Sequence, residues 1–303
     1  MGLFDQDRDL VGYGADVPRA AWPHDARVAV SLSIAYEEGS EFSHAAGDER
    51  QEQLGESVYP AAPGFRDYSL ESVYQYGSRA GVWRLARVLD EHGVKATFFA
   101  SAAALELNPA VAAYLRDSEH EVAGHGWRWE EPHTLTREQE RENLERAIAS
   151  IESTVGTRPR GWISRTVRSA HTRELLVEEG GFAYDSDAFD DDLPYFVRVA
   201  GRPHLVLPYT MVLNDSRYVV AQGFGDPSSF LDYATRTFDR LWQEGEEGPR
   251  MMTIGMHPRW SGHPARASAL SDFIAHAQAR GGVWFARRID IAEWWLAHHS
   301  PPA

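Results

Sequence analysis

Stretches with the two-residue period of a β-strand alternate along this chain with stretches that have the period of an α-helix. The clearest strand is predicted over 27–35, where Val, Leu and Ile alternate with Ala and Ser. Because both faces of this segment are apolar or small, we expect it to be buried on both sides. Six further segments have strand character: 94–100, 121–125, 182–185, 204–209, 251–257 and 283–286.

Amphipathic helical patterns separate several of these strands. Apolar residues recur at helical spacing over 82–89, and Gly93 follows where a glycine commonly ends a helix. A capping box, Thr136 to Gln139, begins another helix that we expect Gly156 to end. About seven strands with intervening helices predict the α/β class, as a distorted (β/α) barrel of parallel strands.

Residues 36–77 interrupt this rhythm with a segment rich in Glu, Gly, Pro and Ser and without strong periodicity. Loops of this length are usually functional or disordered. The segment leaves the end of the first strand, so we expect an insertion over the barrel mouth. No linker or internal repeat divides the sequence, and we therefore predict one catalytic domain over 1–303.

Charge and residue usage exclude several classes of function. Thirty Lys and Arg residues against forty-five Asp and Glu give a formal charge of −15, which opposes binding to nucleic acid or to an anionic membrane surface. Because the chain has no cysteine, it can form no disulfide, thiolate zinc site, iron–sulfur cluster or cysteine nucleophile. The first ten residues lack signal-peptide features and no segment is apolar enough to span a membrane, so we expect a cytoplasmic location.

Polar residues that close the predicted strands are the candidate site residues, because the carboxyl ends of barrel strands form the active-site face. Glu37 and Glu38 end the first strand, His125 ends the third and His257 ends the sixth, while Asp187 follows the fourth strand. Adjacent carboxylates can divide labour, one as a general base and one as its partner. Each position also has an ordinary structural explanation: a solvated loop, a hydrogen-bonded histidine or a turn.

The order of these segments resembles the NodB-homology polysaccharide deacetylase superfamily. The corresponding blocks are AYEEG at 35–39, HGWRW at 125–129, RPR at 158–160, DSD at 185–187 and MH at 256–257. The resemblance implies that Glu37 is the base and that Glu38, His125 and Trp129 stand at the three metal-ligand positions. Trp129 cannot be a ligand, because indole has no free lone pair on nitrogen.

A metal would thus need a third ligand from Glu37, Glu131, His133 or His257. We therefore expect no cofactor, and zinc is the divalent metal for which the protein should be tested.

The substitutions in these blocks resemble one branch of the superfamily, the cofactor-independent allantoinases of purine catabolism and the related cyclic-imide hydrolases. Further matching blocks are YGSRAGVWRL at 76–85, EEGGF through DDDLPY at 178–195, HLVLPYT at 204–210, ND-R at 214–217, and PAR through DIA at 264–292. The resemblance implies hydrolysis of a C–N bond in a small cyclic amide such as allantoin, a hydantoin or a cyclic imide. It also implies a homo-oligomer, a tetramer in this branch.

The resulting hypothesis assigns Glu37 as the base that activates water, Glu38 and His125 as groups that orient it, and His257 as general acid or oxyanion stabiliser. The residues expected to bind substrate are Trp129, Trp162, Arg165 and Asp187. A base without zinc supplies about 10²- to 10⁴-fold, so an electrophilic carbonyl is favoured over a sugar acetamide. Two alternatives stay open: a metal-dependent polysaccharide or peptidoglycan N-deacetylase, and a catalytically silent binding protein.

Overall fold

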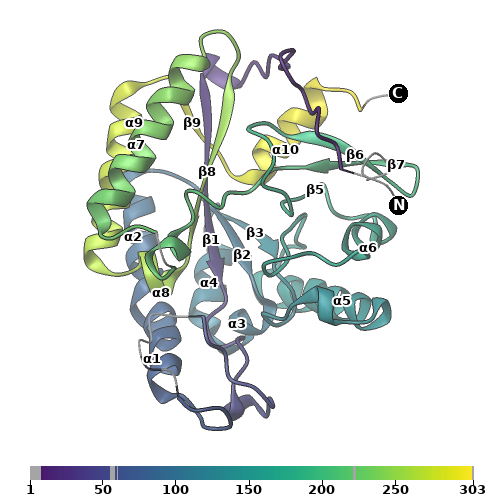
Figure 1. Cartoon of the computed structure of the whole chain (residues 1–303), viewed down its shortest axis with the longest axis vertical. Helices are drawn as coiled ribbons and strands as arrows, with labels where there is room; N and C mark the ends of the chain where they lie inside the picture. Colours follow the sequence, from purple (N-terminus) through teal and green to yellow (C-terminus); the bar gives the residue numbers. More distant parts are fainter. Residues whose placement is uncertain (1–7, 55–58, 60, 221–222, 302–303) are drawn as a thin grey trace.

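The computed structural model describes residues 8–54, 59, 61–220 and 223–301 and shows a curled, mostly parallel sheet (Figure 1). Its strand order is β6-β7-β5-β4-β3-β2-β1-β8, with β9 also paired to β1. The strands are β1 (Val28–Tyr36), β2 (Thr97–Ala100), β3 (Glu121–Gly124), β4 (Gly161–Trp162), β5 (Tyr184–Asp185), β6 (Tyr195–Val199), β7 (Arg202–Val206), β8 (Arg250–Met256) and β9 (Val283–Phe285).

The predicted α/β fold with parallel strands is confirmed, with one difference at the edge. All pairings are parallel except β6 with β7, and the edge strands β6 and β8 do not pair, so the sheet forms a half-barrel. The chain following β7 lies against β8 instead, where Gly255 N–H donates to the Leu213 carbonyl at 3.0 Å. The seven predicted strands are all present, and the two additional ones are β4 and β6.

Strand β1 is the centre of the fold because its alternating pattern serves two cores. All nine of its residues are buried, as predicted. Its branched residues, Val28 to Ile34 in steps of two, pack with α2 (Val82–His92), α7 (Pro227–Glu244) and α9 (Pro264–Arg280). Ala29 faces the barrel interior with Phe99 and α10 (Arg288–His298). Figure 1 shows α2, α7 and α9 together on one side of the sheet.

The remaining helices follow the local signals in the sequence. The capping box of α5 (Arg137–Val155) is formed: Gln139 N–H donates to Thr136 Oγ1 at 3.3 Å and Thr136 N–H to Gln139 Oε1 at 2.9 Å. Gly156 ends this helix in the left-handed conformation, with φ 82°. Further helices are α3 (Ala102–Leu107), α4 (Pro109–Asp117), α6 (Thr172–Glu179) and α8 (Pro258–Ser261).

The segment expected to be an insertion without regular structure is only partly irregular. It ends in α1 (Tyr68–Tyr76), which Asp67 caps by accepting from Leu70 N–H at 2.9 Å, and a π-helical turn, Gly77–Gly81, joins α1 to α2. The sequence of α1 has no strong helical period because the helix buries only Leu70 and Tyr74. Residues 55–58 and 60 of this segment lie outside the described residues.

None of the helices within the described residues combines the length and the apolarity that crossing a bilayer requires.

Candidate active site

The carboxyl edge of the sheet brings together side chains that are far apart in sequence. Glu37 follows β1, His125 follows β3 and His257 follows β8, and all three line a cavity of about 680 Å³. Of the residues predicted to bind substrate, Trp129 and Asp187 also line it. Parallel strands end at the same edge, which is why strand-end positions predicted this convergence.

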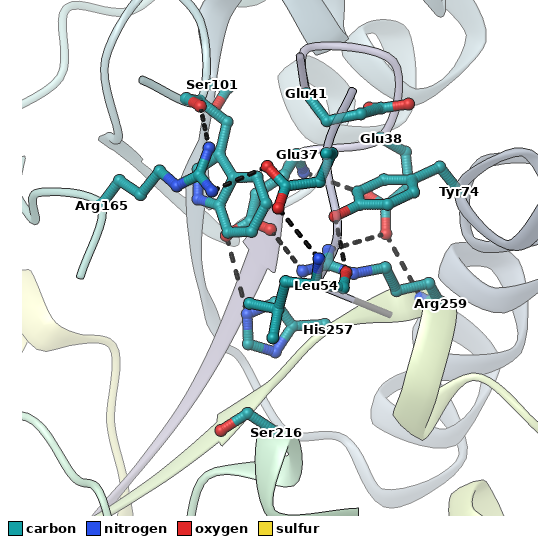
Figure 2. Close-up of polar contacts among 12 residues, drawn as sticks. Glu37, Glu38, Glu41, Leu54, Tyr74, Ser101, Arg165, Ser216, His257 and Arg259 are labelled. Atoms are coloured by element: carbon teal, nitrogen blue, oxygen red, sulfur yellow. Dashed lines mark hydrogen bonds and ion pairs between the residues drawn. The ribbon is translucent and has the colours of Figure 1, made fainter. Parts of the chain in front are cut away.

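Glu37 is the buried centre of the group, with its Oε1 facing two imidazoles; Figure 2 labels one of these, His257, below Glu37. Oε1 lies 3.0 Å from His125 Nε2 and 3.6 Å from His257 Nε2. His125 Nδ1 lies 2.8 Å from the Ile163 carbonyl, and a carbonyl only accepts, so this nitrogen carries a proton. The contact at Nε2 then requires a second proton on His125 or a proton on Glu37.

The second oxygen of Glu37 decides between these two states. Oε2 lies 2.7 Å from the Arg259 guanidinium, and the Arg259 side chain is completely buried. Burial alone would raise the pKa of Glu37, but the charge of Arg259, together with the hydrogen bond from His125, holds the pKa well below its usual range. Glu37 is therefore an ionised carboxylate, and His125 donates to it as an imidazolium.

His257 is oriented by a carboxylate that sequence reasoning missed, Asp215. Its Oδ1 lies 2.6 Å from His257 Nδ1, while Oδ2 accepts from the His257 N–H at 2.7 Å and from Ser261 Oγ at 2.7 Å. These contacts place the proton of a neutral His257 on Nδ1 and direct Nε2 toward Glu37. The only sequence signal for Asp215 was its place in the matched block at 214–217.

Glu38 does not line the cavity, although it is next to Glu37. Its Oε2 accepts from the Glu37 N–H at 3.0 Å and its Oε1 from the Arg259 N–H at 3.2 Å, so it points into closed protein. Burial is the largest influence on Glu38 and, with the charge of Glu37, raises the pKa to about 8 against the opposing charge of Arg259. Glu38 thus supports the chain around Glu37 and does not face the space where a substrate fits.

Two residues expected to bind substrate lie elsewhere. Trp162 does not line the 680 Å³ cavity; it packs edge-on to Phe182, with 5.7 Å between ring centroids, because its side chain projects from β4 to the helix-covered side. Arg165 is buried and does not line the 680 Å³ cavity. It donates to the Trp129 carbonyl at 2.6 Å and to Glu52 Oε2 at 2.7 Å. Its guanidinium lies 3.7 Å from the Trp129 ring centroid, so Arg165 holds Trp129 in place.

Asp187 lies in the cavity wall and is held by one serine. Its two oxygens accept from Ser164 N–H at 2.7 Å and Ser164 Oγ at 2.8 Å. Burial, and then the nearby charge of Asp185, raise the pKa of Asp187 above its usual range. Asp187 can therefore offer a substrate a donor or an acceptor near neutral pH.

The residues at the three metal-ligand positions do not fit a divalent cation. Trp129 offers no lone pair, His125 Nε2 already faces Glu37, and both Glu38 oxygens accept main-chain N–H groups. Within the described residues no three His, Asp or Glu side chains are grouped so that they could hold a metal ion.

Comparison with known proteins places the chain in a family. A polysaccharide deacetylase family model matches residues 67–181. A putative polysaccharide deacetylase of Schizosaccharomyces pombe is 36% identical, over 97% of this chain and 98% of the relative. The chain belongs to the polysaccharide deacetylase family. It is thus a hydrolase of that superfamily, as the strand-end motifs predicted.

Two solved structures are similar to this polysaccharide deacetylase family member over nearly its whole length. A probable polysaccharide deacetylase of Pseudomonas aeruginosa is 44% identical with a TM-score of 0.92, covering 97% of this chain and 99% of the other. The PuuE allantoinase is 43% identical with a TM-score of 0.93, covering 99% and 100%. The predicted NodB-type fold is confirmed, and so is the resemblance to polysaccharide deacetylases and to an allantoinase. The homo-oligomer stays a prediction.

Proposed function

We propose that this protein opens the ring of a small cyclic amide by hydrolysing a C–N bond, with Glu37 activating water and without a metal. Hydantoins and cyclic imides are the expected substrate class, and allantoin is the first member to test. The observation that carries the proposal is the ionised Glu37 carboxylate on the cavity wall, with two imidazole Nε2 atoms 3.0 and 3.6 Å from one of its oxygens. The similarity to the PuuE allantoinase supports the choice of substrate.

In the attack step, Glu37 Oε1 takes a proton from a water molecule that lies between this oxygen and the substrate carbonyl. The oxygen of that water bonds to the carbonyl carbon and gives a tetrahedral oxyanion. The imidazolium of His125 lines the cavity beside Glu37 Oε1, and it stabilises the negative charge as it develops. Because Glu37 is held ionised, it is always available as a base but is a weak one.

In the cleavage step, the ring nitrogen must gain a proton as its bond to carbon breaks. His257 Nε2 lies 3.6 Å from Glu37 Oε1, which makes it the group that can receive the proton from Glu37 and deliver it to nitrogen. Asp215 stabilises the imidazolium form of His257 during this transfer. The products are one carboxylic acid and one N–H, which balance the water consumed.

The weak base and the shape of the cavity both favour an electrophilic, flat substrate. In a hydantoin or imide the leaving nitrogen is shared with a second carbonyl, so it leaves more readily than the nitrogen of an acetamide. Aromatic side chains of Phe99, Trp129, Tyr209 and Trp260 line the cavity and provide flat apolar walls for a planar ring.

The test is ring opening of allantoin, hydantoin, succinimide and dihydrouracil, followed with and without a chelator. We expect turnover of a five-membered ring that the chelator does not change. Glu37→Gln should lower kcat by about 10³-fold or more, because it removes the base. Glu38→Gln is the matched control: it alters the adjacent carboxyl, which does not face the cavity, and should lower kcat by less than about tenfold.

Three results would contradict the proposal in whole or in part. Zinc-dependent release of acetate from chitooligosaccharides, without ring opening, would identify a metal-dependent deacetylase. Tight binding of the cyclic amides without turnover would identify a binding protein. Equal losses of activity in Glu37→Gln and Glu38→Gln would leave ring opening in place but remove Glu37 as its specific base.

A further inference from the structure

The guanidinium of Arg259 lies in a closed compartment that suits a cation. The side chain is completely buried, with Nη2 2.7 Å from Glu37 Oε2 and Nη1 3.7 Å from Glu38 Oε1. Three aromatic rings surround it: its carbon Cζ lies 4.6 Å from the ring centroid of Tyr74, 4.3 Å from that of Trp260 and 5.2 Å from that of Trp129. Figure 2 shows Arg259 reaching toward Glu37 from the side on which Glu38 and Tyr74 lie.

The groups around Arg259 include the positions that the family resemblance associates with a metal. Arg259 contacts Glu38 through its side chain and main chain, and the Trp129 ring lies beside its guanidinium. It is linked to the third position, His125, through the Glu37 carboxylate, which bridges the two groups with one oxygen each. A positive charge therefore stands beside Glu38 and Trp129 and is linked to His125 through Glu37, without any of the three positions acting as a ligand.

We propose that the Arg259 guanidinium is a built-in replacement for the divalent cation, filling its place and fixing the Glu37 carboxylate from the closed side. Arg259 does not line the cavity, so it is a positioning residue that acts through Glu37. The inference rests on the proposed function for its activity measurement only, since its metal-binding measurement needs no substrate.

Electrostatics and packing both support this exchange. A guanidinium stays charged at every working pH and is more weakly hydrated than other cations, so it tolerates a site enclosed by aromatic rings. The ionised carboxylate of Glu37 requires a nearby positive charge, and Arg259 supplies it while also reaching the adjacent carboxyl group of Glu38. A divalent ion would need oxygen or nitrogen lone pairs where Trp129 supplies a ring face.

The π-helical turn between α1 and α2 makes room for Arg259. A Cβ on Gly77 would lie 2.5 Å from Glu38 Oε1 and 2.8 Å from the main-chain nitrogen of Arg259. A Cβ on Gly81 would overlap the Pro258 carbonyl oxygen. Both glycines have ordinary helical φ angles, so close approach is the reason that these positions need glycine. The YGSRAG motif thus admits the chain segment that carries Arg259.

The test is to remove the guanidinium and restore a ligand, then to measure metal uptake. Purified protein is dialysed against Zn²⁺ or Co²⁺, and bound metal is measured by elemental analysis and by the visible absorption of Co²⁺. Wild type and Trp129→His should each hold less than about 0.1 equivalent, because the guanidinium remains. Trp129→His with Arg259→Ala should hold about one equivalent, through Glu38, His125 and the new histidine.

Arg165 provides the matched control, since it is also buried, paired with a glutamate and stacked on Trp129. Trp129→His with Arg165→Ala should not gain metal. If the Arg259→Ala double variant is destabilised, Zn²⁺ should still raise its melting temperature, because an ion that binds only the folded state stabilises it. No rise in melting temperature and no uptake in that variant would overturn the proposal.

Activity gives a second, separate measurement. Arg259→Ala should lose about 10²-fold or more in kcat with a smaller change in KM, and free guanidinium ion should restore part of kcat, whereas sodium ion at the same ionic strength should not. Stoichiometric zinc in the wild-type protein, lost on Glu38→Gln, would overturn the inference even if ring opening is observed. If the double variant takes up metal and wild type does not, as predicted, but no ring opening is observed, only the proposed function is contradicted.

Discussion

The two oxygens of the Glu37 carboxylate face regions of opposite character. On the cavity side, Oε1 meets the imidazoles of His125 and His257, which can gain or lose protons. On the closed side, Oε2 meets Arg259, whose charge is permanent and whose side chain has no exposed surface. The difference separates two tasks: proton transfer is confined to one oxygen, and the other oxygen is held by a charge that does not titrate.

The two regions also differ in how the chain builds them. The cavity side is assembled from strand ends and their following loops, with aromatic walls and open space. The closed side is assembled from glycines that admit neighbouring main chain and from buried carboxyl groups. Variants on the cavity side should therefore change catalysis directly, whereas variants on the closed side should change stability and should change catalysis only through Glu37.

After Glu37→Gln, the largest effect is expected for Asp215→Asn, which acts on the cavity side through His257. An asparagine can present its NH₂ group to Nδ1 of His257, which would move the imidazole proton to Nε2 and remove the acceptor that faces Glu37. We expect kcat to fall by about 10²- to 10³-fold with little change in KM, by the same tautomer argument that applies to catalytic triads. Steady-state kinetics on the best cyclic amide would measure this.

Ser261→Ala is the control for this variant, because it removes one hydrogen bond to Asp215 Oδ2 and leaves the contact with Nδ1. Its kcat should fall by less than about fivefold. If Asp215→Asn behaves like Ser261→Ala, the orientation of His257 does not depend on Asp215.

Most of the fold could be predicted because the residue pattern of β1 and its neighbours already indicates that these strands are buried. The segment 27–35 alternates branched and small residues, and the structure uses those two faces for two different cores. Strand β4, in contrast, has only Gly161 and Trp162, and two residues cannot show a period. Strand β6 is half exposed and antiparallel to β7, so the pattern of a buried parallel strand does not describe it.

The candidate site could be predicted in part, for a similar reason. Glu37, His125 and His257 end strands, and the direction of parallel strands brings strand ends together. Arg259 and Asp215 follow no strand directly, and their importance depends on contacts between distant segments. Trp162 and Arg165 were expected in the cavity because they follow a matched motif, but a motif does not state which way each side chain points.

The closed side can be disturbed most strongly through the glycines that admit Arg259. Gly81→Ala and Gly77→Ala should each destabilise the fold by about 1 to 3 kcal/mol or more, because the new methyl group meets main chain or Glu38 in a packed region. Gly77→Ala should also lower activity, since it pushes against the Arg259 main chain. Urea unfolding would measure the loss of stability.

Gly225→Ala is the matched control for these two variants. A Cβ there would have no heavy atom of the described residues within 4 Å, so stability should stay the same or rise by a few tenths of a kcal/mol. Equal losses for all three variants would show that the close approach at Gly77 and Gly81 has no special importance.

The smallest effect is expected for Glu41, a third carboxyl of the closed side. Glu41 is buried, its Oε2 accepts from Gly39 N–H at 2.6 Å, and burial raises its pKa to about 7 despite that hydrogen bond. One guanidinium cannot neutralise the carboxyl groups of Glu37, Glu38 and Glu41 together. Glu41 is thus protonated in the fold at mildly acidic pH, whereas in the unfolded chain it is already ionised there.

The sign of the pH dependence follows from this difference. Because the folded pKa is above the unfolded one, the contribution of Glu41 to stability is present below about pH 4.5 and is lost as pH rises through about 7. Glu41→Gln should remove that loss, so the variant should gain about 1 to 2 kcal/mol over wild type between pH 5 and pH 8.5. Glu145→Gln, on the exposed face of α5, controls for the loss of one negative charge. The prediction is wrong if the free energy of unfolding depends on pH in the same way in wild type and in Glu41→Gln. Another group would then neutralise Glu41, and Arg259 would interact with Glu37 and Glu38 alone.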